Sequence, residues 1–228
     1  PFDLALVGDG LRLDNNVLGD LASRADDDRD RAVPTAQGVV VGAPGDVTGD
    51  RVPDLLVRDN SWALGDGTDP AVEVVSGAWI ASLCPERRCP AGRTGPLWSD
   101  GDYRRVALQD VTPPARVVLR SPLDNDPRFG AALAGADLDG DGVRDVVVGA
   151  PESSYGAALA GVVLAWRGGA LTGDPWMMAV GDLREPTRFG QSLDATSTAA
   201  GAWLVVGAPS ANAQGPVTGA AFRWRVGR

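Results

Sequence analysis

Four aspartates within nine residues constrain the fold of this chain more than any other feature of its sequence. They follow the pattern D-x-D-x-D-G-x-x-D and lie at Asp137, Asp139, Asp141 and Asp145. Carboxylates this close together repel one another unless a counterion joins them. A hard cation such as Ca²⁺ does so, because it takes six to eight oxygen ligands at roughly 2.3–2.6 Å. The two glycines inside the pattern let the backbone curl tightly. The pattern therefore predicts a calcium-binding loop, with a solvated acidic turn as the alternative.

The loop departs from the EF-hand pattern, which needs a bidentate glutamate at position twelve and a helix on each side. Position twelve counted from Asp137 is Val148, whose side chain cannot bind a metal. The flanking residues are rich in glycine and β-branched side chains, and residues 146–148 are typical of a buried strand. The sequence predicts an EF-hand-like loop placed between two β-strands.

Short sequence motifs recur at a spacing of about 60 residues. Phe129-Gly130 is repeated as Phe189-Gly190, and Gly149-Ala150-Pro151 is repeated as Gly207-Ala208-Pro209. Each Gly-Ala-Pro follows an apolar segment, and each is followed by a turn and a second apolar segment that contains a tryptophan. Repetition at such a period indicates supersecondary units that stack or are arranged radially.

These units resemble FG-GAP repeats, the blades of the β-propeller found in integrin α-subunits and in many secreted bacterial proteins. The resemblance implies an all-β fold made of four-stranded antiparallel blades. It also implies that the loop ion is Ca²⁺ and that its ligands are the four aspartates together with the backbone carbonyl of Val143.

A degenerate copy of the loop lies 91 residues earlier in the chain. Its ligand positions are occupied by Asp46, Thr48, Asp50, the carbonyl of Val52, and Asp54. A threonine here replaces one aspartate, and an arginine replaces the second glycine. A hydroxyl is a weaker ligand than a carboxylate, and the arginine adds a positive charge. The sequence leaves calcium binding at this loop open and predicts that any binding is weaker.

The repeats divide the chain into four segments of different character. We expect residues 1–37 to supply closing strands or a degenerate blade, and residues 38–128 to form a degenerate blade with a cysteine-containing insertion at about 84–102. Residues 129–188 should form a blade with the calcium loop, and residues 189–228 a blade without one. Closed propellers have four to eight blades. We therefore expect a partial propeller, completed by further sequence or a partner chain and with Phe2–Val7 as a possible closing strand. A compact four-bladed ring is the alternative.

The two cysteines, Cys84 and Cys89, lie close together and next to prolines. A metal site would need further Cys or His ligands, and the chain contains no histidine. A small loop closed by a disulfide is the more economical interpretation, and it implies an oxidising compartment. A metal or redox pair is the alternative.

Composition excludes several classes of function. The net charge of −9 and the sequence pI of about 4.5 disfavour a nucleic-acid partner, which would need a basic surface. No segment approaches the roughly 20 apolar residues that span a bilayer. Without histidine or lysine, the chain cannot form a Ser-His-Asp triad, a Schiff base or a histidine-ligated zinc site. A pair of catalytic carboxylates, as in glycosidases, is still compatible with this composition. We nevertheless expect no enzymatic activity.

The favoured function is a non-catalytic, extracellular, calcium-binding module for adhesion, recognition or assembly. Its partner would be a protein or glycan at the cell surface, or further blades of the same polypeptide. The alternative is a carbohydrate-binding or carbohydrate-active module of a secreted protein, in which Trp62, Trp79 and Trp98 contact glycans. Trp166 and Trp224 occupy equivalent places in two repeats, so we expect them to pack inside the fold.

Overall fold

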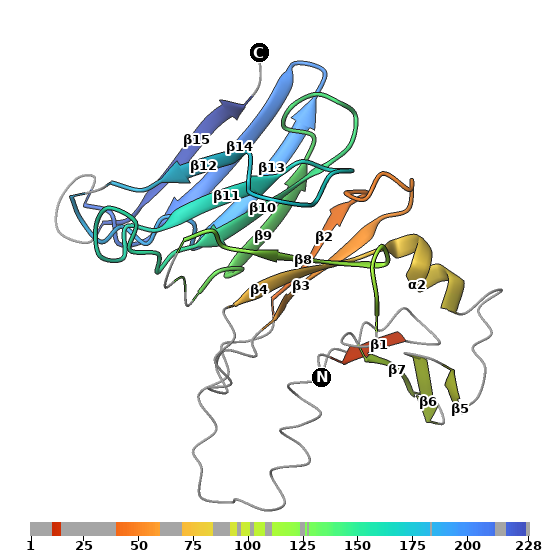
Figure 1. Cartoon of the computed structure of the whole chain (residues 1–228). Coiled ribbons are helices and arrows are strands. Elements are labelled where there is room, and N and C mark those ends of the chain that lie inside the picture. Colours follow the sequence, from red (N-terminus) through yellow and green to blue (C-terminus); the bar gives the residue numbers. More distant parts are fainter. Residues whose placement is uncertain are drawn as a thin grey trace, which may run out of the picture.

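The fold is almost entirely β (Figure 1). The structure, a computed structural model, describes residues 11–14, 40–59, 70–83, 92–94, 97–100, 103–107, 111–123, 126, 128–182, 184–212 and 218–226. In this part of the chain the strands form four sheets, and the one helix is the short α2 (Gly77–Leu83). No described helix has the length and apolar character needed to cross a bilayer.

Three of the sheets are antiparallel and follow one another along the chain. Sheet I has the order β2-β3-β4-β8, sheet II the order β12-β11-β10-β9, and sheet III the order β13-β14-β15. The strands of sheet I are β2 (Val41–Gly45), β3 (Asp54–Asp59), β4 (Ala71–Val75) and β8 (Arg116–Arg120). Those of sheet II are β9 (Ala132–Ala136), β10 (Asp145–Ala150), β11 (Val162–Trp166) and β12 (Met177–Val180). Those of sheet III are β13 (Ser192–Thr198), β14 (Gly201–Ala208) and β15 (Ala220–Val226).

The fourth sheet lies apart from the other three in Figure 1. It has the order β1-β7-β6-β5, in which β1 pairs in parallel with β7. Its strands are β1 (Leu11–Asp14), β5 (Gly92–Thr94), β6 (Leu97–Asp100) and β7 (Tyr103–Ala107). The segment between β4 and β8 therefore leaves sheet I, forms α2 and three of these strands, and returns. Cys84, Cys89 and Phe2–Val7 lie outside the described residues, so the disulfide and the closing strand remain predictions.

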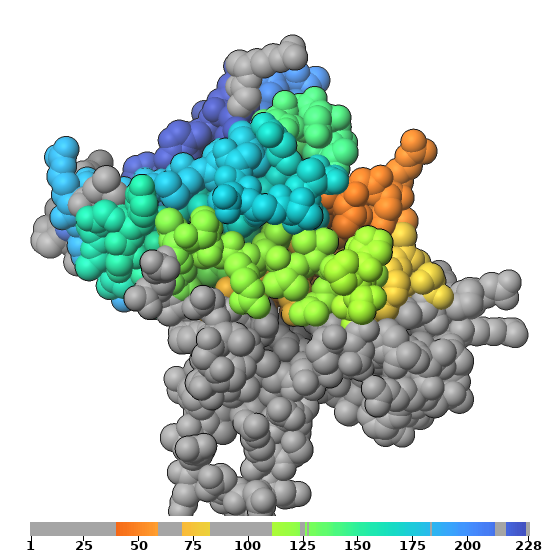
Figure 2. Space-filling model, in the orientation of Figure 1, coloured from red at the N-terminus to blue at the C-terminus, as the bar shows by residue number. Residues whose placement is uncertain are grey.

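Sheets I, II and III pack face to face in sequence order. The first strand of sheet II, β9, lies against β2 of sheet I and β13 of sheet III. Figure 2 shows the three sheets as one continuous body on the face that it draws. Blades of a propeller are related in this way, with their first strands side by side, and the arrangement is compatible with part of a propeller.

The two central strands of sheet II, β10 and β11, are buried on both faces and carry apolar residues at successive positions. Val146 and Leu164 belong to the core shared with sheet I, whereas Val147 and Val163 belong to the core shared with sheet III. Successive side chains of a strand point to opposite faces, so an unbroken apolar run supplies both cores. The run Asp145–Ala150 is buried at every position.

The repeated motifs form equivalent contacts in sheets II and III. The N–H of Gly130 donates to the carbonyl of Gly149 at 3.0 Å, and the N–H of Gly190 donates to the carbonyl of Gly207 at 3.1 Å. Each Phe-Gly phenylalanine also packs edge-to-face on a third-strand tryptophan, with Phe129 and Trp166 5.9 Å apart and Phe189 and Trp224 5.4 Å apart. The Phe-Gly and Gly-Ala-Pro motifs therefore connect, through hydrogen bonds, the segment that precedes the first strand of a sheet with the end of its second strand.

Candidate metal centre

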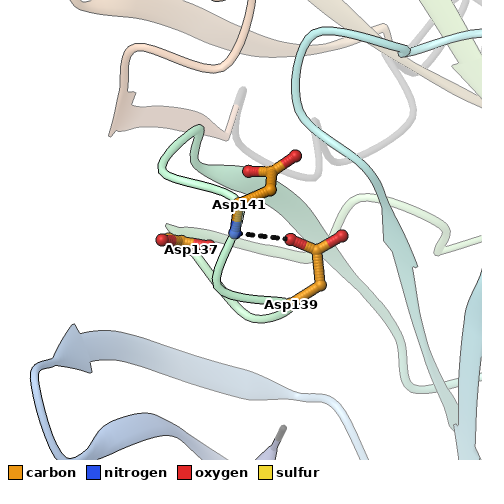
Figure 3. A group of neighbouring side chains, drawn as sticks. All are labelled: Asp137, Asp139 and Asp141. Carbon is orange, nitrogen blue, oxygen red and sulfur yellow. Dashed lines mark hydrogen bonds between the residues drawn. The ribbon is translucent and has the colours of Figure 1, made fainter.

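The acidic loop connects β9 to β10 and brings three of its aspartates together. One carboxylate oxygen from each of Asp137, Asp139 and Asp141 lies within 4.8 Å of the others. Figure 3 shows the three side chains on one tight turn. Asp137 and Asp139 are partly buried, whereas Asp141 is exposed. The loop therefore gathers negative charge where solvent and ions can reach it.

Backbone N–H groups of the loop itself hold this turn in shape. Asp137 accepts hydrogen bonds from the N–H groups of Gly140 (2.7 Å) and Gly142 (3.0 Å). Asp139 accepts from the N–H of Asp141 (3.2 Å), as the dashed line in Figure 3 marks. Both glycines have a positive φ, 83° and 93°, a conformation that costs little only without a Cβ.

Asp145 lies outside this group of three and ties the ends of the loop together. Its side chain is fully buried at the start of β10. One carboxylate oxygen accepts the N–H of Leu138 and the other accepts the N–H of Gly168, both at 2.9 Å. Burial, with a smaller contribution from the charges of Asp139 and Asp141, raises the pKa of Asp145 to about 6 against the effect of these two hydrogen bonds. An added cation would relieve this repulsion.

An arginine that the sequence interpretation missed also reaches the acidic loop. The Nε of Arg167 lies 3.0 Å from Oδ2 of Asp139, and its guanidinium lies 5.1 Å from the centre of the Trp176 ring. Arg167 directly follows β11, and the next residue, Gly168, donates to Asp145. No feature of the local sequence indicates this contact, because 28 residues separate the two partners.

The loop also touches the sheets on either side of its own. The N–H of Asp137 donates to the hydroxyl of Ser197 in sheet III at 3.3 Å. The N–H of Arg144 donates to the carbonyl of Asp46 at 3.2 Å. Beside the loop, in the connection after β11, the N–H of Gly169 donates to the carbonyl of Val47 at 2.8 Å. The loop is thus a junction between all three sheets, and its two neighbours on the sheet I side belong to the second predicted loop.

The second loop, between β2 and β3, has the same main hydrogen bonds as the first. Asp54 occupies the place of Asp145 and accepts the N–H groups of Val47 and Gly77, each at 2.8 Å. Asp46 occupies the place of Asp137 and accepts the N–H groups of Gly49 (2.7 Å) and Arg51 (2.8 Å). The same hydrogen-bonding scheme therefore survives the loss of one aspartate and one glycine.

Side-chain hydroxyl groups also donate to carboxylates of the second loop. The hydroxyl of Thr48 lies 3.2 Å from Asp54, and the hydroxyl of Ser76 donates to Asp50 at 2.8 Å. Slight burial works to raise the pKa of Asp50, but hydrogen bonds from the N–H of Val52 and from Ser76 outweigh it, so that the pKa is lowered. Arg51 adopts φ 70°, in the place where the first loop has a glycine at 93°. Among the described residues, a cluster of three carboxylates occurs at the first loop and not at this one.

The corresponding connection in sheet III is a two-residue turn rather than a loop. β13 ends at Thr198 and β14 begins at Gly201. Asp194, the remaining carboxylate of this repeat, lies exposed within β13.

Of the tryptophans considered in the sequence, Trp166 packs as expected: it is 1% exposed, and its indole N–H donates to the carbonyl of Gly173 at 3.1 Å. Trp224 packs on Phe189 but is 38% exposed. Trp79 is half-buried on α2. Trp62 and the side chain of Trp98 lie outside the described part of the chain.

Residues 129–166 match the family model of the FG-GAP repeat. The matched segment begins at the Phe-Gly motif, contains the whole acidic loop and ends at Trp166. A search of curated proteins found no match.

Proposed function

Because the match of residues 129–166 makes this chain an FG-GAP repeat protein, we propose that it is a non-catalytic, calcium-binding β-propeller module. The observation that carries this proposal is the convergence of the Asp137, Asp139 and Asp141 carboxylates to within 4.8 Å of one another. Like charges at this separation are unfavourable in the folded state unless a cation balances them. Oxygen ligands from carboxylates and carbonyls are those that Ca²⁺ prefers.

The ligands would be Asp137, Asp139, Asp141, the carbonyl of Val143, and Asp145. Both oxygens of Asp145 accept N–H groups, and each carboxylate oxygen has further acceptor capacity for an ion. The bound ion would supply positive charge at the junction of the three sheets, so its role is structural. The second loop, with Asp46, Thr48, Asp50, Val52 and Asp54, would bind calcium more weakly because it has a threonine hydroxyl where the first loop has a carboxylate.

We further propose that the module acts outside the cell, in adhesion, recognition or assembly. FG-GAP repeats mediate protein interactions, and the net charge of −9 suits a protein or glycan partner better than a nucleic acid. The predicted Cys84–Cys89 disulfide would agree with an oxidising compartment. Labelling of free thiols in unfolded, unreduced protein tests that bond, since two reactive thiols per chain would refute it.

Calcium binding is tested by thermal unfolding of the whole chain with Ca²⁺ and with chelator. Binding only to the native state stabilises by roughly 2.7 kcal/mol at a hundredfold excess over the Kd, so chelation should lower the Tm. The double variant Asp139→Asn/Asp141→Asn should lose this calcium response, and Asp194→Asn, an exposed strand residue, should keep it. A parent Tm that is identical with calcium and chelator would overturn the proposal.

A further inference from the structure

Arg167 stands out among the groups near the acidic loop because it is a cation at a proposed cation site. Its Nε contacts Oδ2 of Asp139 at 3.0 Å, and the oxygens of Asp139 lie among those of the other two clustered aspartates. The side chain of Arg167 is 55% exposed and that of Asp139 is 20% exposed. The ion pair thus lies at the solvent edge of the cluster.

The structure holds Arg167 in this position from two directions. Its backbone is fixed because the next residue, Gly168, donates to Asp145 and has no room for a side chain: a Cβ there would lie 2.2 Å from the carbonyl oxygen of Arg144. Its guanidinium lies over the Trp176 ring, a favourable arrangement for a cation. The arginine is therefore aimed at the loop rather than placed near it by chance.

In the second loop, the equivalent position also holds a donor for a loop carboxylate. Ser76 lies 91 residues before Arg167 and also contacts its own loop, although its partner Asp50 is the counterpart of Asp141 rather than of Asp139. Its hydroxyl donates to Asp50 at 2.8 Å, and Gly77 after it donates to Asp54, as Gly168 does to Asp145. One loop thus receives a neutral donor at this place and the other a positive charge.

We propose that Arg167 is a built-in counterion of the acidic loop, which competes with the metal ion for Asp139 and lowers the affinity of the site. This inference rests on the proposed calcium function. In the metal-free protein the guanidinium neutralises part of the cluster, which keeps the loop folded. An arriving divalent cation must take Asp139 from the arginine and then binds beside its positive charge. Arg167 thereby sets the calcium concentration at which the site fills.

The test compares calcium affinities of the whole chain by isothermal titration calorimetry, after removal of metal with chelator. Arg167→Gln removes the charge, and Arg167→Ser places the neutral residue of the second loop at this position. Both variants should bind Ca²⁺ roughly three- to tenfold more tightly than the parent, as expected for removing a unit charge about 4 Å from the site in a solvent-exposed setting. Arg167→Lys retains the charge and should stay near the parent value.

The matched control is Arg223→Gln. The guanidinium of Arg223 also lies over a tryptophan, 4.4 Å from the Trp203 ring, but on sheet III and not at the acidic loop. Its removal should leave the affinity unchanged. A second readout is the Tm of the metal-free protein. Arg167→Gln should lower this Tm because the loop loses its counterion, and Arg223→Gln leaves the charge of the loop unchanged. The rise in Tm on adding calcium should therefore be larger than in the parent for Arg167→Gln alone.

The outcomes separate the two proposals. If the parent binds calcium and the Gln and Ser variants bind it with the same affinity, the role of Arg167 is refuted while the proposed function stands. Binding by these variants but not by the parent would support the counterion role and refute calcium binding by the native chain. If neither binds calcium, both proposals fail.

Discussion

At the scale of single residues, Gly149 shows how a repeated motif becomes a packing contact. A Cβ on Gly149 would lie 2.2 Å from the carbonyl oxygen of Gly190, which lies just before the first strand of sheet III. Backbone atoms cannot move aside as a flexible side chain can. The glycine of Gly-Ala-Pro is therefore required for the close approach of sheets II and III.

We predict that Gly149→Ala destabilises the protein by about 1–3 kcal/mol, the usual cost of overpacking a well-packed interior. Gly207→Ala is the matched control, because it changes the same motif position in sheet III. There the new Cβ would meet the hydroxyl of Ser192, which can rotate away. Urea unfolding of both variants decides the matter, and equal losses of stability would contradict the role assigned to Gly149.

At the scale of the element, the acidic loop is a compact turn whose charges oppose its own folding. Asp145 anchors the turn from a fully buried position, and its pKa is raised from 3.8 to about 6. A carboxyl whose pKa is higher in the folded state than in the unfolded state stabilises folding below both values. That contribution is lost as the pH rises from about 4 to above 6.

We therefore predict that the metal-free protein loses about 2–3 kcal/mol of stability through Asp145 between pH 4 and pH 7. The measurement is urea unfolding in chelator across this range for the parent and Asp145→Asn, which cannot ionise. The stability difference between them should change with pH by this amount. A flat profile for Asp145→Asn would show that burial does not raise the pKa as inferred.

At the scale of the whole molecule, the two faces of sheet III differ in what covers them. One face packs on sheet II through Leu204 and Val206. The opposite face carries Val205 and Arg223. Val205 is 37% exposed, whereas the corresponding residue of sheet II, Val147, is fully buried. In the described part of the chain, β15 also has a strand partner on one side only. A strand edge of this kind invites pairing with another chain or a further blade.

We predict that the isolated chain associates through this face of sheet III as its concentration rises. Val205→Glu should weaken the association, because a charge would be buried in the contact. Val118→Glu is the control, since Val118 is also a strand valine with 37% exposure but lies on sheet I. Sedimentation velocity over a range of concentrations measures this. Monomers at every concentration, or a loss of association in the Val118→Glu protein alone, would contradict the prediction.

Much of this molecule follows from local patterns in its sequence. Apolar runs next to glycine-rich turns predicted the strands, and the recurrence of Phe-Gly and Gly-Ala-Pro predicted equivalent units that pack in series. The aspartate spacing placed a charged turn between β9 and β10. These features are readable because a strand, a turn and a repeat each depend on neighbours within a few residues.

The tertiary structure alone decided how these parts meet. It separated Asp145, which ties the loop ends, from the three aspartates that converge. It brought Arg167 to Asp139 and Ser76 to Asp50, and it sent the segment between β4 and β8 into a separate sheet. Such contacts depend on how whole sheets pack against one another. A local pattern indicates which residues belong to one strand. It does not indicate which side chains from distant parts of the sequence will contact those residues.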